Sequence, residues 1–132
     1  MVLAILLVLA VFVLQTLLPE RFRPRPEGAA NRIEVALGPR DDRAPLSKIG
    51  ARAERALANM HEALPVFLTL ALLNLITQTT GALAVNGAWL FLVARVLYVP
   101  AYLSGITGLR SAVWTVGWVG LVMMLIPLLD RI

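Results

Sequence analysis

The chain has 132 residues, of which 59% are hydrophobic, and its formal net charge is +4. Soluble globular domains are about 45–50% apolar, so this composition argues against a soluble protein. Cysteine is absent and histidine occurs once, which excludes disulfides, a cysteine nucleophile and a cysteine-based metal site, and no metal is expected. The basic residues are not interleaved with aromatic residues, so we expect no nucleic-acid partner. The sequence predicts one domain, residues 1–132, embedded in a lipid bilayer.

Four apolar segments predict an all-α fold, namely an integral membrane four-helix bundle. The predicted spans are residues 1–18, 51–77, 82–103 and 110–129. A cleaved signal peptide is the alternative for the first segment, but that segment has no basic start and no small-residue cleavage site. Proline is expected to end the first helix at Pro19 and to kink the second helix at Pro65. Arg110 or Ser111 is expected to begin the fourth helix.

The loop of residues 19–50 is the one long polar segment. Nine of the twelve Lys and Arg residues lie between Arg21 and Arg55. Because short basic loops of membrane proteins remain in the cytoplasm, we expect loop 19–50 to be cytoplasmic and both termini to lie on the opposite side. Within this loop, Gly38-Pro39-Arg40-Asp41 is predicted to form a turn and Ser47 to cap the second helix.

Polar side chains recur on one face of the second and third predicted helices and at the start of the fourth. They are Arg52, Arg55, Asn59 and Glu62, then Arg95, Tyr98 and Tyr102, then Arg110 and Ser111. The alternating direction of the helices brings all of them to the same half of the membrane. Charged groups persist there only when they pair or line a wet cavity. We therefore predict an ion pair between Glu62 and Arg95, which lie at similar depth.

This polar cluster allows two interpretations. It could be a buried network that locks the bundle together, or it could line a cavity for an anionic polar ligand. Arginine exceeds the acidic residues in the cluster, and its guanidinium pairs well with carboxylates. No motif of a soluble enzyme occurs in the chain. A small-residue face at Gly117 and Gly120 is expected to allow close approach of the fourth helix.

Two motifs resemble the MAPEG family, the membrane-associated proteins in eicosanoid and glutathione metabolism. The motifs are Arg55-Ala56-x-x-Asn59-x-x-Glu62 followed by Pro65, and Ala94-Arg95-Val96-Leu97-Tyr98-x-x-x-Tyr102 followed by Arg110-Ser111. The chain is most similar to the small bacterial members, which implies a bacterial inner membrane. It departs from the family pattern at Ala58, where an arginine is common, and at Trp114, where a tyrosine is expected.

The resemblance implies a homotrimer that binds glutathione at its subunit interfaces. Arg110 and Ser111 match the pair that stabilises the glutathione thiolate. The residues that match glutathione-contacting or supporting positions are Arg55, Asn59, Glu62, Tyr98, Tyr102 and Arg110. The implied function is a glutathione-dependent transferase or peroxidase acting on lipophilic small-molecule electrophiles. A non-catalytic trimeric scaffold or accessory subunit is the main alternative, and a transporter or small channel is a third.

Overall fold

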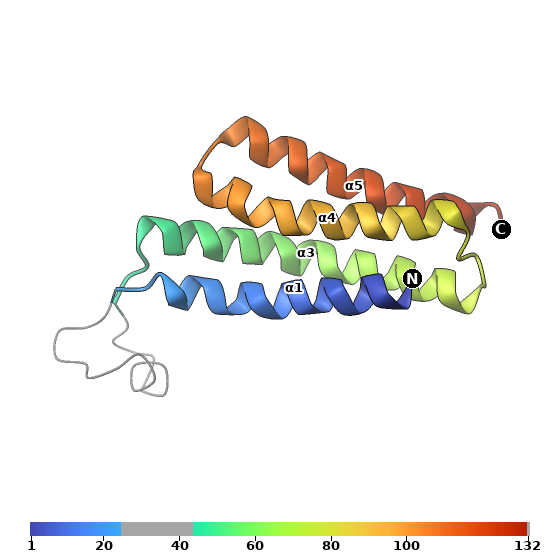
Figure 1. Ribbon diagram of the computed structural model, residues 1–132, viewed down its shortest axis with the longest axis horizontal. Helices are drawn as coiled ribbons and strands as arrows, with labels where there is room; N and C mark the ends of the chain where they lie inside the picture. Colours follow the sequence, from blue (N-terminus) through green and yellow to red (C-terminus); the bar gives the residue numbers. More distant parts are fainter. Residues whose placement is uncertain (25–43, 132) are drawn as a thin grey trace.

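A computed structural model describes residues 1–24 and 44–131, and these residues form four long α-helices. The helices are α1 (Val2–Arg21), α3 (Lys48–Ile76), α4 (Ala82–Ser104) and α5 (Thr107–Leu129). They lie alongside one another, with α1 next to α3 and α4 next to α5 (Figure 1). The described residues thus confirm the predicted all-α four-helix bundle, while the predicted turn at Gly38-Pro39-Arg40-Asp41 lies outside them.

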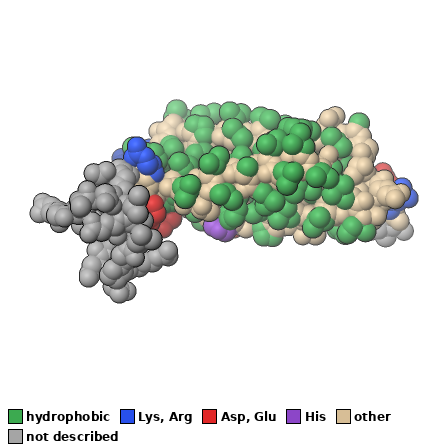
Figure 2. Space-filling model, turned by 60° about the horizontal axis from the view of Figure 1, so that its bottom comes forward, with side chains coloured by type: hydrophobic (Ala, Val, Ile, Leu, Met, Phe, Trp, Pro, Cys, Tyr) green, Lys and Arg blue, Asp and Glu red, His purple; other side chains and the backbone are tan. Residues whose placement is uncertain are grey.

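The outer surface of the bundle is suited to lipid. Each of the four helices is long and apolar enough to cross a membrane. Leu6, Leu14 and Leu17 of α1 expose 58%, 63% and 64% of their surface. Hydrophobic side chains cover the length of the face shown in Figure 2, and charged side chains gather towards its ends. Soluble proteins rarely expose apolar patches of this extent, so the chain is an integral, multi-pass membrane protein.

Small residues and two stacked rings hold the core together. Phe67 of α3 and Phe91 of α4 are fully buried and stack with their ring centroids 4.6 Å apart. Where α4 crosses α5, a Cβ atom on Gly87 would lie 2.6 Å from the carbonyl oxygen of Gly120. The two helix backbones therefore touch, as small residues allow in membrane bundles. This contact confirms that the small-residue face of α5 allows the close approach of a neighbouring helix.

Three helix boundaries differ from the predicted ones by three residues. Helix α3 begins at Lys48 rather than at residue 51, directly after its cap Ser47. Helix α1 continues through Pro19 to Arg21, because a proline in the last turn removes one backbone hydrogen bond without preventing the carbonyl groups from accepting others. Helix α5 begins at Thr107, three residues before Arg110. Gly105 adopts the left-handed conformation (φ +79°) that ends α4 and turns the chain at once into α5. Helix α3 is unbroken at Pro65, and the predicted kink there stays a prediction.

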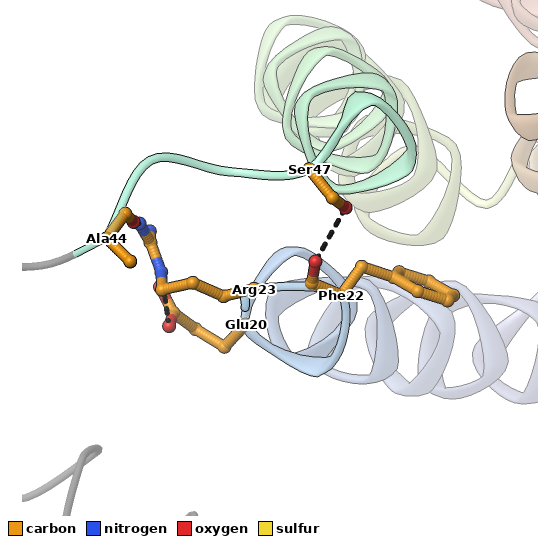
Figure 3. Close-up of polar contacts among 5 residues, drawn as sticks. All are labelled: Glu20, Phe22, Arg23, Ala44 and Ser47. Atoms are coloured by element: carbon orange, nitrogen blue, oxygen red, sulfur yellow. Dashed lines mark hydrogen bonds and ion pairs between the residues drawn. The ribbon is translucent and has the colours of Figure 1, made fainter. Parts of the chain in front are cut away.

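Hydrogen bonds join the end of α1 to the start of α3 (Figure 3). The Ser47 hydroxyl donates to the Phe22 carbonyl oxygen over 2.6 Å and accepts from the Gly50 amide over 3.1 Å, which confirms the predicted cap. Arg23 pairs with Glu20 at 3.0 Å and donates to the Ala44 carbonyl oxygen. The bond to Glu20 raises the pKa of the Arg23 guanidinium, which stays charged. We call these contacts the neck, and the end of the bundle that carries them the loop end.

The opposite end of the bundle is held by Asn74 of α3. Its side chain is fully buried, and its amide group donates to the carbonyl oxygen of Met124 in α5 over 2.8 Å. Its side-chain oxygen accepts from the Thr79 hydroxyl over 2.9 Å. Because both the nitrogen and the oxygen of this buried side-chain amide are hydrogen-bonded, Asn74 fixes the position of α5 against α3.

Candidate functional site

Arg95 of α4 carries a positive charge inside the bundle. Only 1% of its surface is exposed, and its guanidinium lies 4.8 Å from the ring centroid of Phe91 and 5.4 Å from that of Tyr98. Gly117 of α5 provides the space, since a Cβ atom there would lie 3.1 Å from Arg95 Nη2. Nε and Nη2 have no hydrogen-bond partner among the described residues. The aromatic faces compensate only part of the cost of burying this charge.

Asn59 of α3 is the residue that Arg95 binds. Arg95 Nη1 donates to Asn59 Oδ1 over 2.8 Å. Because a guanidinium can only donate, this bond fixes the orientation of the Asn59 amide. Its Nδ2 group makes no hydrogen bond with the part of the chain that the structure describes, and Asn59 lines a cavity. A buried arginine thus sets Asn59 to present two N–H donors to whatever occupies that cavity.

The predicted ion pair between Glu62 and Arg95 is not formed. Within residues 1–24 and 44–131, neither side chain takes part in a salt bridge, and Glu62 is exposed. The two residues do lie on facing helices, but α3 is rotated so that Asn59, one turn earlier on the same stripe, meets the guanidinium. Similar depth in the membrane therefore predicts that Arg95 contacts this part of α3, but it does not predict that the contacting residue is Asn59 rather than Glu62.

A cavity of about 300 Å³ opens between α3, α4 and α5. It is lined by Asn59, Tyr98, Tyr102, Arg110, Ser111 and Trp114. The rings of Tyr98 and Tyr102 contact each other edge to face at 5.5 Å, and the Arg110 guanidinium lies 5.1 Å from the Tyr102 ring centroid. We call this space the tyrosine cavity. Its lining holds hydrogen-bond donors and one fixed positive charge but no carboxylate, which suits an anion.

The start of α5 adds further donors beside Arg110. The N-cap residue, Ile106, provides no side-chain cap, so the first amide groups of the helix lack side-chain acceptors. The backbone amide of Arg110 already bonds to the Ile106 carbonyl oxygen over 3.2 Å. The Ser111 hydroxyl donates to the Thr107 carbonyl oxygen over 3.1 Å, so its lone pairs, rather than its proton, are free. Helix amides and the arginine therefore supply the positive potential at this point.

A second, smaller pocket lies next to the tyrosine cavity at the loop end. Its volume is about 170 Å³. It is lined by Arg52, Arg55, Ala101, Tyr102, Gly105, Ile106, Thr107 and Arg110. Arg52 Nη1 also donates to the carbonyl oxygen of Leu103 over 2.8 Å, at the end of α4. We call this space the arginine pocket, because its lining residues include three arginines and no carboxylate.

Most residues singled out from the sequence come together, although their roles remain predictions. Asn59, Tyr98, Tyr102, Arg110 and Ser111 share the tyrosine cavity, Arg55 lines the arginine pocket, and Glu62 lines neither. Arg52, which its helical offset places in the predicted polar cluster, lines the arginine pocket beside Arg55. Thr107 lines the same pocket and was not singled out from the sequence. Thr107 lacked any signal because α5 was expected to begin after it.

Comparison with known proteins gives one clear match. The model of the MAPEG family matches residues 1–129 of the chain and so covers all four helices. The search of curated proteins found no match.

Proposed function

This chain belongs to the MAPEG family, and on that premise we propose that it is a glutathione-dependent membrane transferase or peroxidase acting on lipophilic electrophiles. The observation that carries the proposal is the tyrosine cavity. It combines Arg110, Ser111, two tyrosines and the oriented Asn59 amide around one space, with no carboxylate among its lining residues. Glutathione has two carboxylates and an ionisable thiol, and this set of donors fits such a molecule.

Arg110 is the group that would activate the thiol. A free thiol has a pKa of about 8.5, and a neighbouring guanidinium lowers it, because the positive charge stabilises the thiolate. The start of α5 adds the partial positive charge of its first amides. The Tyr102 ring, 5.1 Å from the Arg110 guanidinium, holds the arginine in place. The co-substrate supplies the nucleophile, so the absence of cysteine from the chain is no obstacle.

Ser111 would act only after a rotation. Its hydroxyl proton is used in the bond to Thr107, so stabilising a thiolate requires the hydroxyl to turn towards the cavity. Arg110 therefore carries the larger part of thiolate stabilisation in our proposal, and Ser111 the smaller. Tyr98 and Asn59 would bind the oxygen atoms of the ligand. Arg55 lines the neighbouring pocket and Glu62 lines neither space, so these two would contact the ligand only where it extends beyond the tyrosine cavity along α3.

The lipophilic substrate would enter from the membrane. Trp114 lines the tyrosine cavity and stacks at a tilt on Trp118, with ring centroids 5.7 Å apart, and 40% of each side chain is exposed. An apolar electrophile dissolved in lipid would reach the thiolate along these rings. We further propose a homotrimer in a bacterial inner membrane, with loop 19–50 cytoplasmic, since nine basic residues lie between Arg21 and Arg55.

The scaffold alternative is less well supported. A polar network that serves only assembly should satisfy its own arginines, as buried ionic networks in stable bundles do. Here Arg95 retains two unpartnered nitrogens, and Arg110 makes no salt bridge within residues 1–24 and 44–131. Arg110 lines both open spaces, and Arg95 holds Asn59, which lines one of them. The arrangement is therefore better suited to holding a ligand than to locking helices.

The proposal is tested with the full chain purified in detergent. Calorimetry measures glutathione binding, and a chloro-dinitrobenzene acceptor reports thiol transfer. A pH titration of the ultraviolet thiolate absorbance gives the pKa of bound glutathione. We expect Arg110→Ala to raise that pKa by at least about one unit and to reduce turnover at least tenfold at neutral pH.

Arg131→Ala is the matched control, because it removes an exposed arginine from the opposite end of the bundle. It should leave binding, thiolate pKa and turnover unchanged. Absence of binding at millimolar glutathione in the unmodified chain would refute the proposal. Binding without any transfer, with the thiolate pKa unaffected by Arg110→Ala, would favour the scaffold or accessory role instead.

A further inference from the structure

The arginine pocket has a different character from the tyrosine cavity. Its walls bring together Arg52, Arg55 and Arg110, whereas the tyrosine cavity contains only the last of these. Arg110 and Tyr102 line both spaces, so their stacked side chains form a shared wall. Three like charges around about 170 Å³ repel one another, and an anion in their midst would relieve that repulsion.

The start of α5 contributes to the same pocket. Ile106 and Thr107, the N-cap and first residue of the helix, are lining residues, and no side chain caps the amides that follow. Free amide groups at the start of a 23-residue helix attract anions through hydrogen bonding and through the helix dipole. Guanidinium forks and free helix amides together are the donor set that recognises the tetrahedral oxygens of phosphate.

The pocket also lies where phosphate groups are abundant. It is built from the second turn of α3, the last turn of α4 and the turn into α5, all at the loop end of the bundle. Helices long enough to span the apolar core place such ends at the level of the lipid headgroups. Arg52 is held in this position by its bond to the Leu103 carbonyl oxygen and has further N–H groups to offer.

From these observations we propose that the arginine pocket is a binding site for a phosphate group, supplied by an anionic phospholipid headgroup or by free phosphate. The site shares Arg55 and Arg110 with the residues proposed above for glutathione, and its own ligand can be tested in the absence of glutathione. It is separated from the tyrosine cavity by the Arg110–Tyr102 wall, and Arg52 and Thr107 line this pocket but not the tyrosine cavity.

Thr107 allows a direct test. It is exposed, and at the first position of α5 a glutamate is compatible with the helix dipole, so Thr107→Glu should fold. Its carboxylate would occupy the pocket and repel a phosphate. Thr107→Gln is the matched control of nearly the same size without charge. Lys48→Gln removes an exposed basic residue from the same end of the bundle without touching the pocket.

Two probes distinguish the sources of phosphate. Native mass spectrometry of the protein from phosphatidylcholine nanodiscs containing phosphatidylglycerol counts retained lipid. Thermal unfolding in detergent with inorganic phosphate, at constant ionic strength, measures binding of the free anion. We expect Thr107→Glu to weaken binding of the effective probe at least about tenfold and the two glutamine variants to change it less than about twofold. If Thr107→Glu does not fold, Arg52→Lys, which keeps the charge but loses the fork, should still lower affinity.

Each result decides the matter. Retention of phosphatidylglycerol that is lost in Thr107→Glu supports the site and assigns it to lipid, and a response to inorganic phosphate alone assigns it to the free anion. Equal behaviour of Thr107→Glu and Thr107→Gln would overturn the proposal. It would also be overturned if only glutathione bound and Thr107→Glu abolished that binding, because the pocket would then belong to the thiol co-substrate.

Discussion

The crossing of α4 and α5 offers a sharp test of how the site is held. Gly87→Ala would place a Cβ atom 2.6 Å from the Gly120 carbonyl oxygen and 2.9 Å from Met123 Cβ. Ordinary contact begins at 3.4 Å, so the helices must separate by about 0.8 Å, the difference between 3.4 and 2.6 Å. A backbone carbonyl cannot rotate away as a side chain can. The separation must therefore move a whole helix.

The expected loss of stability follows from two opposing effects. Alanine in a helix interior is favoured over glycine by about 1 kcal/mol. Overpacking a close contact costs about 1–3 kcal/mol, and the upper part of that range applies because backbone atoms collide. We therefore expect Gly87→Ala to lower the free energy of unfolding by about 1–2 kcal/mol. Because Tyr98 lies on α4 and Arg110 on α5, the same shift should widen the tyrosine cavity and weaken glutathione binding.

Unfolding in mixed detergent micelles, followed by circular dichroism, measures this change. Gly108→Ala is the control, because a Cβ atom there meets nothing within 4 Å and the helix propensity gain stands alone. It should be at least as stable as the unmodified chain. Equal stability of Gly87→Ala and Gly108→Ala would refute the reasoning, since it would show that the two backbones do not touch in the membrane protein.

Three further substitutions probe individual contacts. Asn59→Asp should raise thermal stability, because Arg95 gains a carboxylate as its partner. The same variant should weaken glutathione binding about tenfold in calorimetry, because an oxygen replaces the N–H donors in the cavity. Unchanged affinity would contradict the orientation of the Asn59 amide. Ser47→Ala should cost about 1–2 kcal/mol in chemical unfolding through loss of the cap, and no measurable loss would mean that the neck does not stabilise the fold. Asn74→Leu should cost about 0.6–1.7 kcal/mol in the same assay, whereas a gain would show that its bond to Met124 is not worth its burial.

The fold could be predicted from the sequence because each span is long and uniformly apolar. Hydropathy alone identifies such helices, and the cap at Ser47 follows from a local preference of serine. The start of α5 could not be predicted in this way. Ile106 is not a preferred capping residue, and α5 begins directly after it, at Thr107, because Gly105 turns left-handed and the Ser104 hydroxyl accepts from the Ile106 amide over 3.3 Å. These contacts exist only after the chain has turned.

The level of the polar cluster could also be predicted, since helical offsets fix which side chains share a face. The choice of partner for Arg95 could not, because it depends on the rotation of α3. That rotation is set by packing, with Ala56 and Met60 buried in the bundle and Gly117 opening space for the guanidinium. A shift of one helical turn exchanges a carboxylate for an amide, and with it an ion pair for an oriented hydrogen bond.

The neck holds the end of α1 against the start of α3 by direct hydrogen bonds, whatever the number of residues between them. Phe22 and Ser47 are joined directly, so the positions of α1 and α3 do not rely on residues 25–43 to bring them together. Extending a closed loop costs only about 0.6 kcal/mol for each doubling of its length. An epitope tag or small reporter domain inserted there should leave the helices in register. Such an insertion would carry a label to one face of the membrane while the site on α3, α4 and α5 stays intact.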